Sequence, residues 1–219
     1  MKSEAKTPIK LNVAVSINNN IDGLYAIRKP SVPAVIWRRT PLSKFQTWID
    51  SLSDEQLPSA RISLPLNAIS GALTEVMQIS GTPACVQRET LMDDITALAN
   101  VFAKINQTKF LRLRLEAITG NACSKFHIDA VTTRLVCTYR GPGTQYCFSA
   151  DDCNSSNIYD VPTSSPIVMR GTLWPTKERS GFLHRSPPIE GSGKTRLLLV
   201  LDPISDPKIE PNRTNFSIH

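Results

Sequence analysis

Hydrophobic residues recur every three to four positions in the first half of the chain, a spacing that is typical of helices. This spacing predicts helices at residues 40–52, 67–78 and 88–107. The helix at 88–107 has the clearest apolar stripe, which comprises Leu91, Ile95, Leu98, Val101, Phe102 and Ile105. We expect this stripe to lie in the core, because an apolar helix face must be covered by another apolar surface.

From residue 110 onward the hydrophobic period changes to two, which indicates strands. The β-rich runs are residues 110–118, 134–140, 144–150, 166–174 and 195–202. Residues 23–39 mix β-forming residues with two prolines and are expected to form short edge strands. Helices followed by several short strands predict an α+β fold, in which a helical layer at about 40–107 backs an antiparallel sandwich or barrel.

The length of 219 residues fits a single domain, which we place at residues 23–205. Residues 1–22 are polar and are expected to form a flexible N-terminal arm, and residues 206–219 a C-terminal tail. The polar stretch at 149–165 is long for a loop, so we expect a lid or a substrate-contacting element there.

Charge and composition exclude several classes of protein. The chain has 25 Lys and Arg against 19 Asp and Glu, but the basic residues are scattered, which makes nucleic-acid binding unlikely. No apolar run approaches the ~18 residues of a membrane span, and the N-terminus lacks the pattern of a signal peptide. Five cysteines, an odd number, favour a reducing cytoplasm over a disulfide framework. We therefore expect a cytoplasmic protein with a small-molecule or peptide substrate.

Two internal histidines stand in positions that suggest a metal site. His127 and Asp129 are two residues apart in a segment expected to be extended, so their side chains share one face. His184 follows 57 positions later. Two histidines and one carboxylate match the facial triad of non-haem Fe(II) oxygenases, which leaves the other coordination positions open.

Arg196 extends this pattern, since it stands 12 positions after His184 at the start of an apolar strand. A guanidinium binds a carboxylate through two parallel hydrogen bonds. An iron enzyme that uses a 2-oxo acid as co-substrate needs such a group at the far end of its pocket.

Two alternatives remain open from the residues alone. Cys123, His127, Cys147 and Cys153 offer four ligands to zinc, although no Cys-x-x-Cys pair is present. Such a site would indicate zinc storage, sensing or delivery. The other alternative is a non-catalytic, cupin-like binding module with a vestigial metal site.

The chain resembles known families at two levels. The spacing of His127, Asp129, His184 and Arg196 is similar to that of the Fe(II)/2-oxoglutarate-dependent dioxygenases, whose fold is a double-stranded β-helix, a jelly-roll or cupin-like barrel. The segments ACSKFHIDAVTTRLVCTYRGPGTQY and LHRSPPIEGSGKTRLLLVLDP resemble the bacterial family called domain of unknown function 1826, over about residues 34–203. That family brings no established activity, and an association of some members with zinc-responsive gene sets suggests metal homeostasis.

The dioxygenase resemblance implies a role for each residue of the pattern. The Fe(II) ligands would be His127, Asp129 and His184. Arg196 would bind the distal carboxylate of 2-oxoglutarate, with the Tyr139 hydroxyl as a candidate second partner. Arg140 and Arg185 are close to these residues in sequence and are candidates for binding an anionic substrate.

Overall fold

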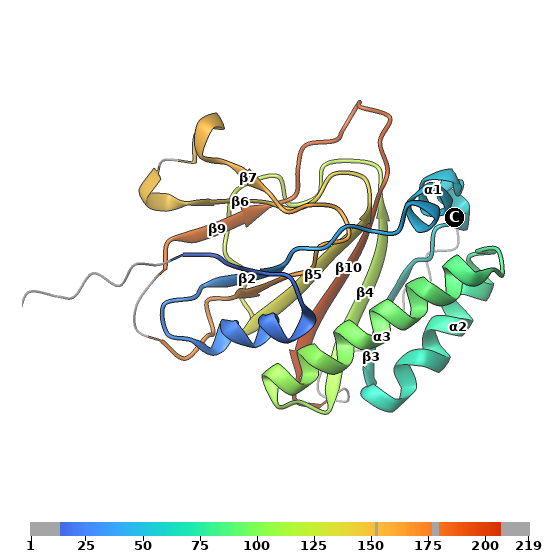
Figure 1. Cartoon of the computed structure of the whole chain (residues 1–219), viewed down its shortest axis with the longest axis horizontal. Helices are drawn as coiled ribbons and strands as arrows, with labels where there is room; N and C mark the ends of the chain where they lie inside the picture. The colour runs from blue at the N-terminus through green and yellow to red at the C-terminus, as the bar shows by residue number, and fades with distance from the viewer. Residues whose placement is uncertain (1–13, 152, 177–179, 207–219) are drawn as a thin grey trace, which may run out of the picture.

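Two β-sheets and a layer of helices make up the structure, so the architecture is α+β with one large sheet (Figure 1). The computed structural model describes residues 14–151, 153–176 and 180–206. Within these residues the large sheet has the strand order β1-β2-β8-β5-β10-β4-β3, antiparallel except between β1 and β2. Its strands are β1 (Ser16–Asn18), β2 (Ala34–Trp37), β3 (Ala60–Pro65), β4 (Phe110–Ile118), β5 (Thr133–Arg140), β8 (Ile167–Arg170) and β10 (Arg196–Ile204).

The small sheet lies on one side of the large one (Figure 1). It consists, in order, of β7 (Tyr159–Asp160), β6 (Gln145–Phe148) and β9 (Phe182–Arg185). One buried cluster joins Tyr146 and Phe182 of the small sheet to Val136, Leu198 and Val200 of the large sheet. Apolar side chains therefore fill the space between the two sheets.

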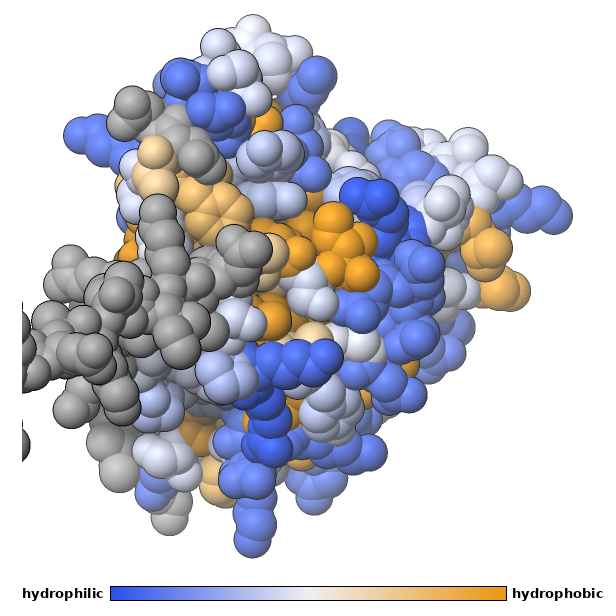
Figure 2. All heavy atoms as spheres, turned by 60° about the vertical axis from the view of Figure 1, so that its left-hand side comes forward, coloured by the Kyte–Doolittle hydropathy of each residue, from blue (hydrophilic) through white to orange (hydrophobic). Residues whose placement is uncertain are grey.

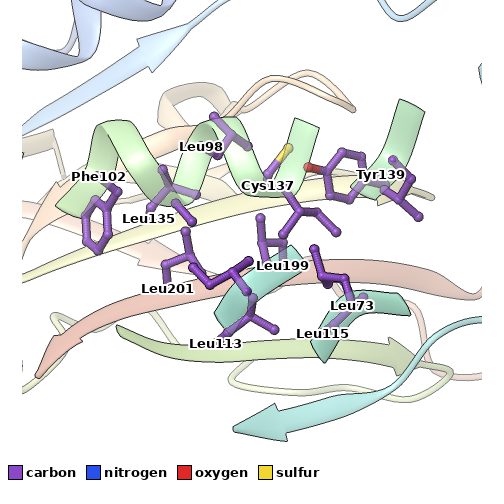
Figure 3. Close-up of a cluster of buried hydrophobic side chains, with 14 of the residues drawn as sticks. Leu73, Leu98, Phe102, Leu113, Leu115, Leu135, Cys137, Tyr139, Leu199 and Leu201 are labelled. Carbon is purple, nitrogen blue, oxygen red and sulfur yellow. The ribbon is translucent and has the colours of Figure 1, made fainter. Parts of the chain in front are cut away.

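Helices pack against the opposite face of the large sheet. They are α1 (Ser43–Ser51), α2 (Ile69–Ile79) and α3 (Val86–Asn106), with the short 3-10 helices η1 (Ile21–Arg28), η2 (Asp54–Gln56) and η3 (Leu66–Ala68). Two further 3-10 helices, η4 (Ser149–Asp151) and η5 (Ser155–Asn157), lie between β6 and β7 of the small sheet. A second buried cluster joins Leu73 of α2 and Leu98 of α3 to Leu113 and Leu199 of the sheet (Figure 3). None of the helices in the described residues combines the length and apolarity that a membrane span requires.

The central strand β10 is buried on both faces and separates the two clusters. Leu197, Leu199 and Leu201 belong to the cluster on the helix side, whereas Leu198 and Val200 belong to the cluster between the sheets. This follows from the strand period of two, which sends successive side chains to opposite faces. The near-continuous apolar run of β10 is typical of a strand that is covered on both sides.

The apolar stripe expected on the third helix is confirmed. Leu91, Ile95, Leu98 and Phe102 of α3 have no exposed surface. Figure 3 shows Leu98 and Phe102 beside strand residues such as Leu135 and Leu201.

On the face of the molecule seen in Figure 2, hydrophilic residues surround smaller hydrophobic areas.

The N-terminal part of the chain differs from the prediction. Residues 14–22 are not a loose arm, since β1 pairs with β2 and Asn20 caps η1 by accepting a hydrogen bond from Gly23. Leu24 and Ile27 are three residues apart and both fully buried, a helical spacing that overrides the β-forming residues around them. The rest of the predicted arm, residues 1–13, and residues 207–219 of the predicted tail lie outside the described residues.

The stretch at 149–165 contains regular secondary structure and is partly packed into the core. It contains η4, η5 and β7, and Val161 in it is almost fully buried. The Ser164 amide donates to the Thr138 carbonyl at 2.7 Å, which ties the end of this stretch to β5. Gly143 allows the approach, since a Cβ atom there would lie 1.8 Å from the Val161 carbonyl oxygen. The second half of this stretch is therefore packed against the large sheet, and its role as a lid or a substrate-contacting element stays a prediction.

We predict that Leu98→Ala lowers the free energy of unfolding by about 2–5 kcal/mol, because it removes buried methyl groups and leaves a cavity beneath α3. Urea unfolding followed by circular dichroism measures the change. Val86→Ala on the same helix is the control, since Val86 is 78% exposed and its loss should matter little. Equal stabilities of the two variants would show that the stripe is not the core contact described here.

Candidate metal centre

A backbone bridge brings together the two histidines that are 57 residues apart in sequence. The His127 amide donates to the His184 carbonyl, and the His184 amide donates to the His127 carbonyl, each at 3.0 Å. The bridge adds His127 to the edge of the small sheet beside β9. Directly opposite residues of an antiparallel pair project to the same face. The two imidazole rings accordingly lie 4.5 Å apart, centroid to centroid.

Asp129 completes a group of three side chains with converging ligand atoms. One of its carboxylate oxygens lies 3.1 Å from His184 Nε2 and the other lies 3.5 Å from His127 Nε2. One ligand atom from each of the three residues lies within 4.8 Å of the others. The sequence prediction that His127, Asp129 and His184 converge is thus met by the geometry. Among the described residues this is the group able to hold a metal ion.

Backbone contacts with the segment after β8 hold Asp129 in place. The Asp129 carbonyl accepts a hydrogen bond from the Thr172 amide at 2.9 Å, and the Thr132 carbonyl accepts from the Gly171 amide at 2.9 Å. Gly171 is required at this point, because a Cβ atom would lie 2.0 Å from the Val131 carbonyl oxygen and 2.6 Å from that of Asp129.

The hydrogen bond of His127 leaves the correct nitrogen available for a metal. Its Nδ1 lies 2.8 Å from the Lys125 carbonyl oxygen, which can only accept a hydrogen bond. Nδ1 must therefore carry the proton, and the lone pair of Nε2 is free on the side that faces Asp129. Metal-bound histidines commonly have such a backbone partner, which fixes both the tautomer and the orientation of the ring.

The Asp129 carboxylate is charged and has one oxygen without a hydrogen bond. Its Oδ1 forms an ion pair with Arg134 Nη1 at 2.5 Å. Burial by itself would raise the pKa of Asp129, but His184, Arg134 and His127 together outweigh it and hold the pKa at about 2. Its Oδ2 is buried and receives no hydrogen bond from the described residues. A buried acceptor without a donor is costly, and a cation at this point would remove that cost.

Arg196 is buried in the space between the sheets. It is 1% exposed, and its guanidinium donates to the Pro142 carbonyl at 2.7 Å and to the Ser186 and Thr138 hydroxyls at 3.2 Å. Ser186 stands two residues after His184, so Arg196 contacts the continuation of the strand that carries a metal ligand. Burial lowers the pKa of Arg196 to about 10, which keeps it charged at neutral pH.

Tyr139 lies on the wrong face of the sheet to share a ligand with Arg196. It belongs to the cluster beneath the helices, where Figure 3 shows it with Cys137 and Leu98. Its hydroxyl donates to Asp94 of α3 at 2.6 Å. The reason is strand alternation, because Thr138 rather than Tyr139 has the parity that faces Arg196. The sequence analysis did not identify Thr138 and Ser186 as partners of Arg196. Strand alternation would have indicated both, because Thr138 is two residues after Val136 and Ser186 is two residues after His184.

The two arginines expected at the substrate also have other roles. Arg140 donates to the Leu52 carbonyl at 2.8 Å, which fixes the end of α1 against β5. Arg185 lies over the Phe126 ring and donates to Gln145 at 2.8 Å. Its neighbour in β9, His184, faces the other side of the small sheet. Strand alternation thus places Arg185 on the outer face of the small sheet, whereas Arg140 is held by its contact with the end of α1.

The cysteine-based zinc site does not form. Cys147 and Cys153 are joined in a disulfide, so neither offers a thiolate, and Cys123 is an exposed free cysteine. The disulfide also departs from the expectation of fully reduced cysteines. Its two cysteines are six positions apart in sequence, and it links Cys147 of β6 to Cys153, which precedes η5.

Sequence comparison places the chain in a family. Residues 18–202 match the model of the family described as a protein of unknown function (DUF1826). The chain belongs to this family. The match confirms the resemblance noted in the sequence and covers the segments that carry His127, Asp129 and His184, as well as β10 up to Asp202. No curated protein matches the chain.

Solved structures support the fold. Dioxygenase for auxin oxidation 1 from Arabidopsis thaliana, in a complex with 2-oxoglutarate, has a TM-score of 0.52 at 9% identity, covering 89% of this chain and 93% of the other. A prolyl-4-hydroxylase from Pseudomonas putida has a TM-score of 0.38 at 14% identity, covering 77% and 97%. Rice dioxygenase for auxin oxidation has a TM-score of 0.43 at 12% identity, covering 78% and 72%. At these identities the likeness concerns the fold alone, and it rests on the first structure.

We predict that the metal-free protein binds one divalent first-row metal ion, with His184→Ala and Asp129→Ala each weakening the affinity by more than about 100-fold. We expect this lower limit because mutating residues that only hydrogen-bond to a metal ligand already lowers the metal affinity by about 10–100-fold. Removing a ligand itself should have a larger effect. Cobalt(II) titration with visible absorption measures both affinity and ligand type. Cys123→Ser is the control and should change nothing, and a thiolate-to-cobalt charge-transfer band in the parent protein would contradict the assignment.

Proposed function

We propose that the protein is a mononuclear non-haem oxygenase that uses Fe(II) and 2-oxoglutarate, with His127, Asp129 and His184 as the metal ligands. The strand arrangement supports a double-stranded β-helix, in which β8, β5, β10 and β4 face β7, β6, β9 and the bridging segment at His127. The donor set of two imidazoles and one carboxylate suits Fe(II) and leaves coordination positions open.

The observation that carries this proposal is the buried, unpaired charge of Arg196. No carboxylate of the described residues forms an ion pair with it, and its three hydrogen bonds go to neutral oxygens. A guanidinium has five N–H donors, so two remain for a ligand. A buried charge is expensive unless it is paired, and the carboxylate of a 2-oxo acid would pair it.

Fe(II) with bound 2-oxoglutarate supplies the oxidising chemistry, in which O2 is activated and the co-substrate is decarboxylated. In the proposed function the protein's own residues do the rest. Asp129 and the two histidines hold one face of the site and leave the other open. Arg196, positioned by Thr138 and Ser186, orients the co-substrate through its distal carboxylate. The apolar side chains of Leu198 and Val136 exclude water from the space between the sheets.

We predict that Arg196→Lys weakens 2-oxoglutarate binding at least tenfold while leaving the metal affinity unchanged, because a lysine keeps the charge but loses the planar fork. Titration of the anaerobic Fe(II) protein with 2-oxoglutarate measures the effect through the charge-transfer absorption of the complex. Arg185→Lys is the matched control, since Arg185 lies on the outer face of the small sheet.

The same titration separates the competing functions. Metal binding without any 2-oxoglutarate binding would favour a metal-dependent binding module and would overturn the oxygenase proposal. A 2-oxoglutarate affinity that is equal in the parent and in Arg196→Lys would show that the co-substrate site lies elsewhere.

A further inference from the structure

Four arginines lie on strands β3, β4 and β5 of the large sheet, on the face that carries Arg196, and β10 separates β4 from β5. Arg61 belongs to β3, Arg112 and Arg114 to β4, and Arg134 to β5. In β4 the alternate residues Leu111, Leu113 and Leu115 face the helices, so Arg112 and Arg114 face the opposite side. We call these four residues the arginine strip.

A chain of ion pairs connects the strip to the metal centre. Arg134 contacts Asp129 at 2.5 Å and donates to both oxygens of Asp202, at 2.7 and 2.9 Å. Asp202 in turn lies 3.7 Å from Arg114 Nη2. Arg114 is the direct cross-strand partner of Arg61 at the edge of the sheet. The strip thus runs from a metal ligand to the outer strand β3.

Arg114 has few acceptors among the described residues. Asp202 and Glu116 share its face, but both oxygens of Asp202 already accept hydrogen bonds from Arg134. Within the described residues Arg114 forms no hydrogen bond, and its buried Nε has no partner. Arg61 is exposed and lies directly opposite Arg114. Like charges directly opposite across a strand pair destabilise a sheet.

We propose that the arginine strip binds an anionic group of the substrate, a phosphate or a carboxylate, through Arg114 and Arg61. This inference rests on the proposed function, because it assigns a substrate class to the same site. Guanidinium groups bind both of these anions through paired hydrogen bonds. Such a ligand would remove the repulsion between the two arginines. The Arg114 side chain is 18% exposed and Arg61 on the neighbouring strand β3 is exposed, so both are in contact with solvent.

The size of the strip favours a small molecule. Two arginines with spare donors accommodate one anionic group, whereas a nucleic acid requires many phosphate contacts along a continuous basic surface. Asp202 and Arg134 connect Arg114 to Asp129 through ion pairs, so the proposed anion position lies on the same face of the sheet as the candidate metal centre.

The test uses the metal-free, full-length protein with inorganic phosphate and malonate as separate probes, at constant ionic strength set with sodium chloride. We expect calorimetric titration to show binding of at least one probe, which identifies the anion class. Arg61→Gln and Arg114→Gln should each weaken that binding at least tenfold, and the outer-face control Arg185→Gln should not. Arg61→Gln should also raise the urea midpoint in buffer without either anion, since it removes the repulsion.

Several outcomes would overturn the inference. These are no binding of either probe, binding that Arg61→Gln leaves unchanged, or a stabilisation that chloride reproduces in full. Binding that is lost in Arg196→Lys would place the anion at the co-substrate position, and binding of a nucleic acid far tighter than both probes would point to a different partner. A failure of the proposed function is separable, because it appears as absent 2-oxoglutarate binding while the strip variants still alter phosphate or malonate binding.

Discussion

The pair of backbone hydrogen bonds between His127 and His184 is the constraint on which the rest of the site depends. It joins two segments 57 residues apart and fixes both imidazoles on one face of the small sheet. Asp129 stands two residues after His127, so its side chain projects to the same face. The geometry of the three ligand atoms is therefore a consequence of one cross-strand bridge and of the strand period. A register shift of one residue would send His184 to the outer face, where Arg185 now lies.

The second constraint is the double burial of β10, which lets one strand serve two purposes. Its odd-numbered leucines bind the helices to the sheet, and its even-numbered positions carry Arg196, apolar residues and Asp202 into the inter-sheet space. Arg196 and Asp202 are six residues apart on the same face, a span of about 20 Å along the strand. Under the proposed function, the co-substrate and substrate ends of the site are thus opposite ends of a single strand.

The sequence was informative where one periodic pattern governs the structure. The stripe of α3, the alternation of β4 and the shared face of His127 and Asp129 follow from counting by 3.6 or by two, whereas the position of His184 depends on the cross-strand bridge. The sequence was misleading where the face of the sheet had to be assigned to an individual strand residue, as for Tyr139 and Arg185. Neighbouring positions of a strand face opposite sides, so an error of one residue reverses the assignment. The Arg134 contact and the Cys147–Cys153 disulfide depend on which segments meet in space, and no local pattern in the sequence carries that information.

Arg134 shows why the metal centre and the arginine strip are physically one unit. Asp202 is 2% exposed, and a carboxylate buried this far needs the two hydrogen bonds that Arg134 donates. The same guanidinium binds Oδ1 of Asp129 and leaves Oδ2 directed at His184. It thereby orients the proposed metal ligand without occupying the proposed metal position. Because Arg134 is shared between the two carboxylates, Arg114 is left with only a 3.7 Å approach to Asp202, and that shortage of acceptors is what makes the outer end of the strip a site for an anion.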